Sequence, residues 1–275
     1  MIEVHYRKGR LGNRLFRYAI GRILAEEMGY RLSLVDNFFG RIVPHRAFSN
    51  THDMVEGKVY HAPVEEYKQE IYPNKLPKSL REIITDSTPR KLQLHGWYQR
   101  TEYYEPYIDR IKVWFELPKI DVSPDDIILH IRRGDYLGAN IAIKLKYYTD
   151  ILDKALYRRV YIIGEGLDLS VYKTFKRYDP IYPRGSEIED FNLMKNFNKI
   201  VMSNSTFAWW AAYLSSAQEV YYPVTPKGFF SPLYSKETGQ DLRVNRKTYR
   251  QISGVKYVRK SPIDLIISKF LRHSI

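Results

Sequence analysis

The chain has 275 residues, of which 44% are hydrophobic and 27% are charged, and this composition supports a packed core and excludes a disordered protein. It carries 44 Lys and Arg against 31 Asp and Glu, which gives a net charge of +13. It contains no cysteine, so disulfides, thiolate metal sites, iron–sulfur clusters and a cysteine nucleophile are excluded.

The sequence has no pattern typical of a membrane span or a secretory signal. Its longest apolar run, residues 207–214, is far shorter than the roughly 18–20 residues that a span requires. The N-terminus has no basic region before an apolar stretch. We therefore expect a cytoplasmic protein.

The first residues predict a strand, a glycine loop, a helix and a second strand. Residues 2–6 alternate and are β-rich, and a glycine loop follows over residues 9–13. Apolar residues recur at helical spacing over 15–24, and residues 32–35 again favour a strand. Residues 36–118 are rich in Pro, His and Tyr, which predicts short strands and loops with few helices.

A second regular pattern follows a linker at residues 118–124. Continuous apolar runs predict buried strands at residues 127–131, 160–163, 199–202 and 219–222. Periodic segments between them predict helices at residues 146–156, 169–176, 188–196 and 206–214. Because strand and helix alternate, we expect a parallel sheet with right-handed crossovers. The whole chain therefore predicts an α/β fold of two lobes with a cleft between them.

The strongest candidate site is the segment His130–Tyr136, which follows a buried strand. Ligands bind at the carboxyl ends of parallel strands. Arg132 and Arg133 offer planar forks that hold phosphate oxygens, and Gly134 permits a close backbone approach. Asp135 can orient an arginine or accept hydrogen bonds from a sugar. The alternative is an ion-pair cluster that fixes a loop.

A second candidate site is the segment Ser203–Ala212, which follows the predicted strand at 199–202 and opens a helix. Free backbone N–H groups and the helix dipole favour an anion at such a turn. Simple helix capping is the alternative, and Trp209 and Trp210 by themselves favour core packing. Together the two segments indicate a diphosphate held between an arginine pair and a helix N-terminus.

A third candidate is the glycine loop over residues 9–14. It lacks the G-x-G-x-x-G spacing of a dinucleotide site and the lysine of a P-loop. A loop between the first strand and helix can still face the cleft, where Asn13 can hydrogen-bond a sugar hydroxyl or a phosphate.

These segments, in this order, resemble the α-1,2-fucosyltransferases of glycosyltransferase family 11, in particular the bacterial members. Residues 9–19 match most of the family's G-G-L-G-N-Q-x-F-Q-Y-A segment. The motif H-x-R-R-G-D-Y is complete at 130–136, and S-N-S-[ST]-F-[SA]-W-W-A-A is complete at 203–212. Residues 94–99 look like the family's G-Y-[FW]-Q segment.

The resemblance implies a GT-B-like fold with two Rossmann-like lobes and the donor site mainly in the C-terminal lobe. It implies an inverting, metal-independent transfer of L-fucose from GDP-fucose to a hydroxyl, galactose O2, of a surface polysaccharide or lipopolysaccharide precursor. No cofactor and no nucleic-acid partner are expected. The expected division is an acceptor-side lobe at 1–118, a nucleotide-sugar-binding lobe at 119–235, and a basic tail with a short amphipathic helix at 236–275.

The resemblance also assigns roles to residues of this sequence. We expect Arg132 and Asp135 to be catalytic residues. For Asp135, we favour the role of orienting an arginine over the role of a general base. The expected donor-binding residues are Gly12, Asn13, His130, Arg132, Arg133, Glu165, Ser203, Asn204, Ser205 and Thr206. The expected acceptor-side residues are His95, Trp97 and Gln99. The general base stays open among Asp135, His5, His95 and His130.

The sequence departs from the family pattern in two places. Arg10, Arg14 and Arg17 replace Gly, Gln and Gln in the first motif, which favours either an acidic acceptor or an exposed helix face. An acidic turn of the family is replaced by residues 164–166, Gly-Glu-Gly, in which Glu165 can accept hydrogen bonds from guanine N1 and N2. A different nucleotide sugar is therefore the nearest alternative donor.

The positive charge concentrates at the C-terminus. Residues 236–275 hold ten Lys and Arg against three Asp and Glu, so +7 of the +13 lies there. Residues 263–272 have the apolar spacing of an amphipathic helix, which favours either an anionic membrane surface or packing on the protein body. A non-catalytic anion-binding or nucleic-acid-binding protein is the alternative from another functional class.

Overall fold

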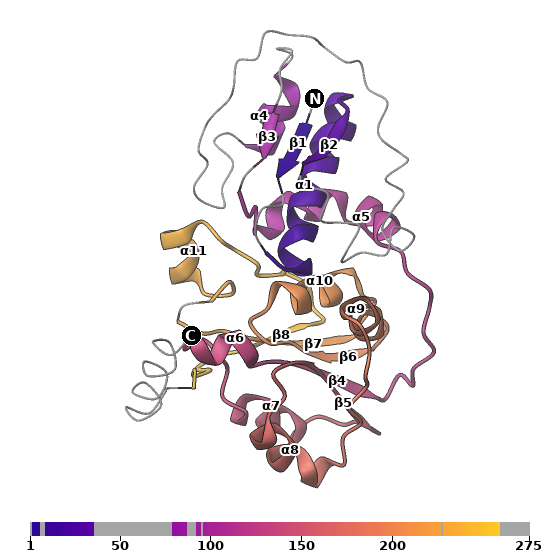
Figure 1. Ribbon diagram of the computed structural model, residues 1–275, viewed down its shortest axis with the longest axis vertical. Helices are drawn as coiled ribbons and strands as arrows, with labels where there is room; N and C mark the ends of the chain where they lie inside the picture. The colour runs from indigo at the N-terminus through magenta and orange to yellow at the C-terminus, as the bar shows by residue number, and fades with distance from the viewer. Residues whose placement is uncertain are drawn as a thin grey trace, which may run out of the picture.

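The computed structural model describes residues 2–5, 9–35, 79–86, 92–94, 96–226 and 228–258, which form two parallel sheets (Figure 1). The first sheet has the strand order β2-β1-β3. Its strands are β1 (Ile2–His5), β2 (Leu32–Val35) and β3 (Leu92–Leu94), and both neighbours pair parallel to β1. The predicted strands at 2–6 and 32–35 are confirmed.

The helix α1 (Leu11–Met28) packs against this sheet and ends at Gly29. Gly29 adopts a left-handed conformation with φ 64°, and its N–H donates to the carbonyl of Ala25, which closes the last turn. The helix begins at Leu11, earlier than the apolar periodicity predicts, because its first turn is buried against the rest of the protein.

Short elements precede and follow β3, the last strand of the first sheet. The helix α4 (Leu80–Thr85) begins with a capping box between Ser79 and Glu82. It is followed, after β3, by the 3₁₀ turns η1 (Thr101–Tyr103) and η2 (Glu105–Tyr107) and by α5 (Ile108–Trp114). The helix α5 was not predicted, and its buried anchor is Ile111. Residues 36–78, within the predicted loop region, lie outside the described residues.

The second sheet has the strand order β5-β4-β6-β7-β8, and every neighbouring pair is parallel. Its strands are β4 (Ile127–Arg132), β5 (Val160–Glu165), β6 (Lys199–Val201), β7 (Glu219–Pro223) and β8 (Tyr249–Ile252). The four predicted strands and the α/β class are confirmed. The strand β8 was missed because it is an edge strand with exposed Arg250 and Gln251, so it has no apolar run.

Helices cover both faces of this sheet (Figure 1). Alternate residues of β4 face two cores: Ile128 packs with α9 and α10, whereas Leu129 packs with α7 and α8. The helices are α6 (Gly134–Gly138), α7 (Lys146–Leu152), α8 (Leu169–Phe175), α9 (Glu187–Lys195), α10 (Thr206–Leu214) and α11 (Pro232–Thr238), and a 3₁₀ turn η3 (Lys176–Tyr178) follows α8.

An aromatic cluster joins the two sheets into one continuous core. Trp209 and Trp210 of α10 are fully buried. The Trp210 ring lies 4.8 Å from Phe16 of α1 and 5.3 Å from Tyr104, centroid to centroid. The tryptophan pair of the segment Ser203–Ala212 therefore belongs to the core, as these residue types favour. It packs α10 against the N-terminal part of the chain.

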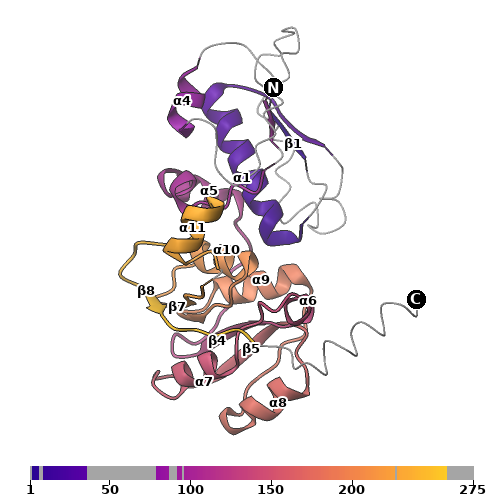
Figure 2. The same ribbon diagram turned by 90° about the vertical axis from the view of Figure 1, so that its left-hand side faces the viewer.

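The helices α1 and α10 meet closely at Gly12. A Cβ atom on Gly12 would lie 2.5 Å from the carbonyl carbon of Thr206 and 2.6 Å from its hydroxyl oxygen. The Thr206 hydroxyl donates to Asn13 Oδ1 over 2.9 Å. Figure 2 shows the lower end of α1 directly above the helices of the second sheet. Only glycine permits this approach, because two of the three nearest atoms, Phe207 N and Thr206 C, belong to the backbone and cannot move aside.

No described helix is long and apolar enough to cross a bilayer. Residues 236–258 of the predicted tail include the end of α11 and all of β8. The predicted amphipathic helix at 263–272 lies outside the described residues, so membrane contact through it stays a prediction.

We expect Gly12→Ala to lower the free energy of unfolding by about 1–3 kcal/mol, because the added methyl group overpacks a backbone contact. Urea unfolding of the purified chain measures this change. Gly138→Ala is the matched control, since a Cβ there meets no atom within 4 Å. Equal stability of the two variants would contradict the close approach of α1 to α10.

Candidate functional site

The carboxyl ends of β4 and β6 bring the two strongest motifs together. The strands are neighbours in the sheet, and His130 of β4 lies beside the turn that follows β6. Its Nδ1 atom is 2.7 Å from the hydroxyl oxygen of Ser203, and its ring stacks on Phe207 at 5.1 Å. Burial, and then the charge of Arg132, lower the pKa of His130 to about 3. This imidazole is therefore neutral at physiological pH and a weak base.

Arg132 lies at the centre of a chain of opposite charges. Its guanidinium makes two hydrogen bonds to Asp135, at 3.0 and 3.1 Å, and an ion pair with Glu165 at 2.6 Å. Glu165 also pairs with Arg10 from the start of α1. Burial alone would raise the pKa of Asp135, but the hydrogen bonds and charge of Arg132 bring it below its usual value. Asp135 thus stays ionised and holds Arg132 in position.

Arg133 is held in a different place. Its Nε atom donates to Asp168 over 2.9 Å, and Asp168 also caps α8 by accepting from the N–H groups of Ser170 and Val171. Arg133 is 8% exposed and is not among the described residues that line the cavity at Arg132. The two adjacent arginines therefore have different surroundings, which their sequence does not distinguish.

The turn after β6 is almost completely buried. Ser203, Asn204 and Ser205 are each at most 4% exposed. Ser203 contacts His130, the Asn204 amide donates to the Ile141 carbonyl over 2.9 Å, and Ser205 makes no capping hydrogen bond with its side chain. Much of the polar character of this turn thus serves local structure.

Asn13 and Gln99, expected at the donor and acceptor sides, bond to each other. Gln99 Nε2 donates to Asn13 Oδ1 over 2.9 Å, and the same oxygen accepts from Thr206. Gln99 Oε1 in turn accepts from the amide of Gln240. A polar chain thus runs from the first turn of α10 through α1 to the segment before β8.

The remaining acceptor-side residues are Trp97 and His95. Trp97 is half-buried, and the guanidinium carbon of Arg17 lies 4.4 Å from its ring centroid. A Cβ on Gly9, which has φ 109°, would lie 3.0 Å from that ring. Arg17 is thereby 4% exposed and belongs to the interior, which excludes an exposed helix face at that position. His95 lies outside the described residues.

A cavity of about 430 Å³ opens at Arg132, between the start of α1 and the ends of β4 and β5. Its described lining consists of Arg10, Arg14, His130, Arg132, Gly164, Glu165, Glu187, Asp190 and Phe207. Its size and its place at the carboxyl ends of parallel strands are typical of a ligand site. Among the residues that the structure describes, no group of three His, Asp or Glu side chains is placed to hold a metal ion.

Glu187 and Asp190 of α9 were not predicted as site residues. The sequence signal is weak, because an acidic first turn is also what a helix N-terminus favours. Burial, and then the charge of Glu189, raise the pKa of Asp190 to about 6. Unlike Glu165, Asp190 makes no ion pair with a described residue.

The Gly-Glu-Gly segment 164–166, whose first two residues the structure places at the end of β5, requires its glycines for backbone packing. Gly164 has φ 140°, and a Cβ there would lie 2.8 Å from the carbonyl carbon of Ile131. Gly166 has φ 66°, and its Cβ would lie 2.5 Å from the Cα of Gly134. Both glycines let this segment pack against the backbone of Ile131 and Gly134, which sets Glu165 beside Arg132.

Residues 115–228 match the model of the family described as glycosyl transferase family 11. The matched range includes both strand-end motifs and leaves out the glycine loop. The chain is similar to an alpha-1,2-colitosyltransferase of Escherichia coli, at 21% identity over 76% of this chain and 86% of that protein. It is also similar to galactoside alpha-(1,2)-fucosyltransferase 2 of Sus scrofa (24% identity, 78% of this chain and 69% of that protein) and of Oryctolagus cuniculus (25%, 78% and 67%).

We expect Asp190→Asn to stabilise the fold at pH 8 by on the order of 1 kcal/mol and to leave it unchanged at pH 3.5. The folded carboxyl has a pKa of about 6, above the ordinary value of 3.8, so folding favours its protonated form. The free-energy cost of burying the ionised carboxylate is thus absent at a pH below the unfolded pKa, and it grows as the pH rises from 4 to 6. Urea unfolding at the two pH values measures it, and equal differences at both would contradict it.

Proposed function

We propose that this chain, a glycosyltransferase of family 11, transfers L-fucose from GDP-fucose to O2 of a galactose in a glycan acceptor. The family match and the named relatives confirm the resemblance and the enzyme class. The relatives' names share the α-1,2 linkage and include galactoside fucosyltransferases. The observation that carries the proposal is Arg132, fixed by two carboxylates in a cavity at the carboxyl ends of the strands.

We assign the two sheets to the two lobes of a GT-B arrangement, with residues 1–118 on the acceptor side and the second sheet on the donor side; because β8 pairs with β7, this lobe extends past the expected boundary at 235 into the predicted tail. The cavity at Arg132 supports this assignment, because residues of α1 and of the second sheet line it together. The acceptor in this proposal is a surface polysaccharide or lipopolysaccharide precursor, as in the bacterial members that the motifs resemble.

The reaction is an inverting displacement. The acceptor hydroxyl forms a bond to C1 of fucose from the face opposite GDP, the bond from C1 to the diphosphate oxygen breaks, and the acceptor proton passes to a base. Arg132 stabilises the negative charge that develops on the diphosphate, so the proposed reaction needs no metal. A diphosphate can replace Glu165 as the anion that Arg10 and Arg132 share.

The proton acceptor stays open, with one restriction from the electrostatics. His130, with a pKa of about 3, is too weak a base at neutral pH, whereas Asp135 is ionised but held by Arg132. The oxocarbenium character of such transition states lowers the demand for a strong base, by analogy with glycoside hydrolysis.

We assign the recognition of guanine to Asp190, in place of Glu165. A carboxylate reads guanine by accepting hydrogen bonds from N1 and N2, as proposed for Glu165 from the sequence. Glu165 is occupied by two arginines, whereas Asp190 lines the same cavity without an ion pair to a described residue. Because the Asp190 carboxylate is partly desolvated, two new hydrogen-bond donors stabilise it more than they would stabilise Glu165, which is already paired.

The test of function is GDP release from GDP-fucose in EDTA, with galactose-terminated acceptors and with other nucleotide sugars in parallel. Colitose lacks the 3-hydroxyl of fucose, so GDP-colitose is the most informative competitor donor. We expect release that needs GDP-fucose and rises with one acceptor. We also expect Arg132→Ala to lower the rate by about 10²–10³-fold at saturating donor, while Arg110→Ala, outside the cavity, keeps it. An unchanged rate for Arg132→Ala would contradict the assignment.

Titration calorimetry tests the base-reading role. We expect Asp190→Asn to weaken GDP binding by about tenfold or more and to leave UDP binding within twofold of the unaltered chain. Glu165→Gln is the comparison variant, for which we expect the preference for GDP over UDP to persist. A preference lost in Glu165→Gln and kept in Asp190→Asn would return the guanine contact to Glu165.

A further inference from the structure

A second, larger cavity of about 610 Å³ shares no lining residue with the cavity at Arg132. It opens between the 3₁₀ turns η1 and η2 and the segment 241–245, beside Tyr222 near the end of β7. Its described lining consists of Arg100, Thr101, Glu102, Glu105, Tyr222, Asp241, Arg243, Val244 and Asn245. None of these residues takes part in the proposed donor site.

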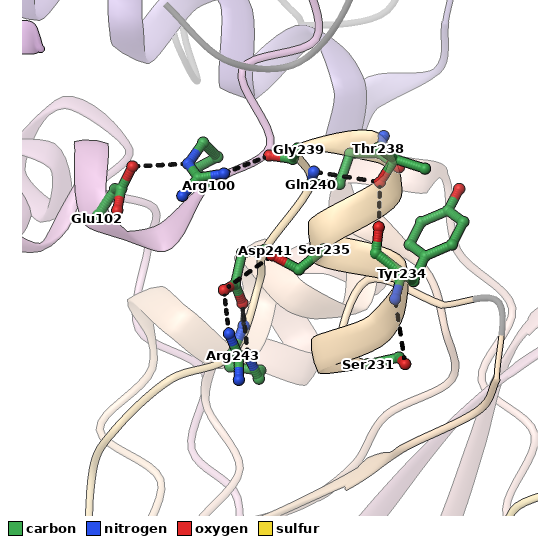
Figure 3. Close-up of polar contacts among 10 residues, drawn as sticks. All are labelled: Arg100, Glu102, Ser231, Tyr234, Ser235, Thr238, Gly239, Gln240, Asp241 and Arg243. Atoms are coloured by element: carbon green, nitrogen blue, oxygen red, sulfur yellow. Dashed lines mark hydrogen bonds and ion pairs between the residues drawn. The ribbon is translucent and has the colours of Figure 1, made fainter.

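Each carboxylate of this cavity is held by an arginine. Arg100 Nε donates to Glu102 over 2.6 Å, and its Nη1 atom donates to the Gly239 carbonyl over 2.7 Å (Figure 3). Arg243 Nε donates to Asp241 over 2.8 Å. The third carboxylate, Glu105, accepts from Arg246 at 3.1 Å and from the Tyr213 hydroxyl at 2.6 Å. With Arg246, which lies outside the lining, three arginines thus pair with the three carboxylates of this cavity, so none of these carboxylates is left without a cationic partner.

Two polar side chains of the lining lack a hydrogen-bond partner among the described residues, and of these only Asn245 is exposed to a ligand. The hydroxyl oxygen of Thr101 is buried and makes no hydrogen bond to a described residue. Asn245 is exposed, and no hydrogen bond joins its side chain to the described residues. The lining combines fixed carboxylates that accept hydrogen bonds, guanidinium and amide groups that donate them, and an aromatic side chain. These groups suit a neutral ligand with many hydroxyl groups. That ligand class is a saccharide.

The two cavities have no lining residue in common, but one short segment leads from the neighbourhood of Arg10, which lines the first cavity, to the second. The segment 97–101 begins at Trp97, which packs near Gly9, and continues through Gln99 to Arg100 and Thr101 in the second cavity. Its backbone pairs with the C-terminal part: Asp241 N–H donates to the Gln99 carbonyl, and Thr101 N–H donates to the Asp241 carbonyl, each over 2.8 Å. A glycan that extends from Arg10 past Trp97 would thus follow the segment 97–101 to the second cavity.

We propose that the second cavity binds the non-reacting sugar units of a neutral glycan acceptor. This inference rests on the proposed function, since it takes the cavity at Arg132 as the donor site. The balanced arginine–carboxylate pairs select against an acidic acceptor, which the arginines of the first motif alone would favour. The cavity then contributes to the KM of an oligosaccharide acceptor and leaves the reacting atoms unaffected.

The test compares two acceptors of the full-length chain: lacto-N-tetraose, a neutral tetrasaccharide ending in β-galactose, and methyl β-galactoside. The variants are Asn245→Ala and Glu102→Gln, with Glu27→Gln as the matched control because Glu27 pairs with Arg110 outside both cavities. We expect both variants to raise the KM of the tetrasaccharide by about fivefold or more, with its kcat and the KM of methyl β-galactoside within about twofold. An equal increase in the KM of both acceptors, or no increase in either KM, would overturn the proposal.

Saturation-transfer NMR separates this proposal from the donor assignment. It measures binding of the tetrasaccharide without turnover, and we expect the signal to weaken in both variants and not in the control. If the tetrasaccharide binds in this way but GDP is not released from GDP-fucose, the glycan site in the second cavity is supported and the assignment of GDP-fucose as the donor is overturned. Donor turnover without tetrasaccharide binding, or tighter binding of its sialylated form, would overturn the neutral glycan site.

Discussion

The molecule depends on how closely its first helix approaches the helix that follows β6. Gly12 allows the backbone of α1 to reach the first turn of α10, and Asn13 accepts the hydrogen bond of Thr206 at that point. The packing of Phe16 against Trp209 and Trp210 extends the same contact into the core. Because these contacts join residues almost 200 positions apart, they fix the N-terminal sheet against the C-terminal sheet.

The cavity at Arg132 follows from that contact. With α1 held at α10, the start of α1 brings Arg10 to Glu165, which already pairs with Arg132 at the end of β4. Three charged side chains from separate parts of the chain thus form one row, and Asp135 ends it. Such a row keeps guanidinium groups ordered and partly desolvated, which strengthens their interaction with an incoming diphosphate.

Sequence reasoning succeeded where one local signal dominates. Continuous apolar runs located β4 to β7, and the strand-end segments at His130–Tyr136 and Ser203–Ala212 lie side by side as the parallel topology requires. It missed β8, where Arg250 and Gln251 are exposed on an edge strand. It also missed Asp190, whose acidic neighbours are equally expected at any helix N-terminus.

The sequence by itself determined the α/β class, the order of most elements and the segments that carry the chemistry, because apolar periodicity and glycine positions are local properties of the chain. Only the tertiary structure decided that Arg132 lines the cavity while Arg133 pairs with Asp168, and that Asn13 bonds to Gln99 and Thr206. The physical reason is that a side chain's partner, and the water it loses, depend on which distant segments pack beside it. Identical residue types therefore differ in role only once the chain has folded.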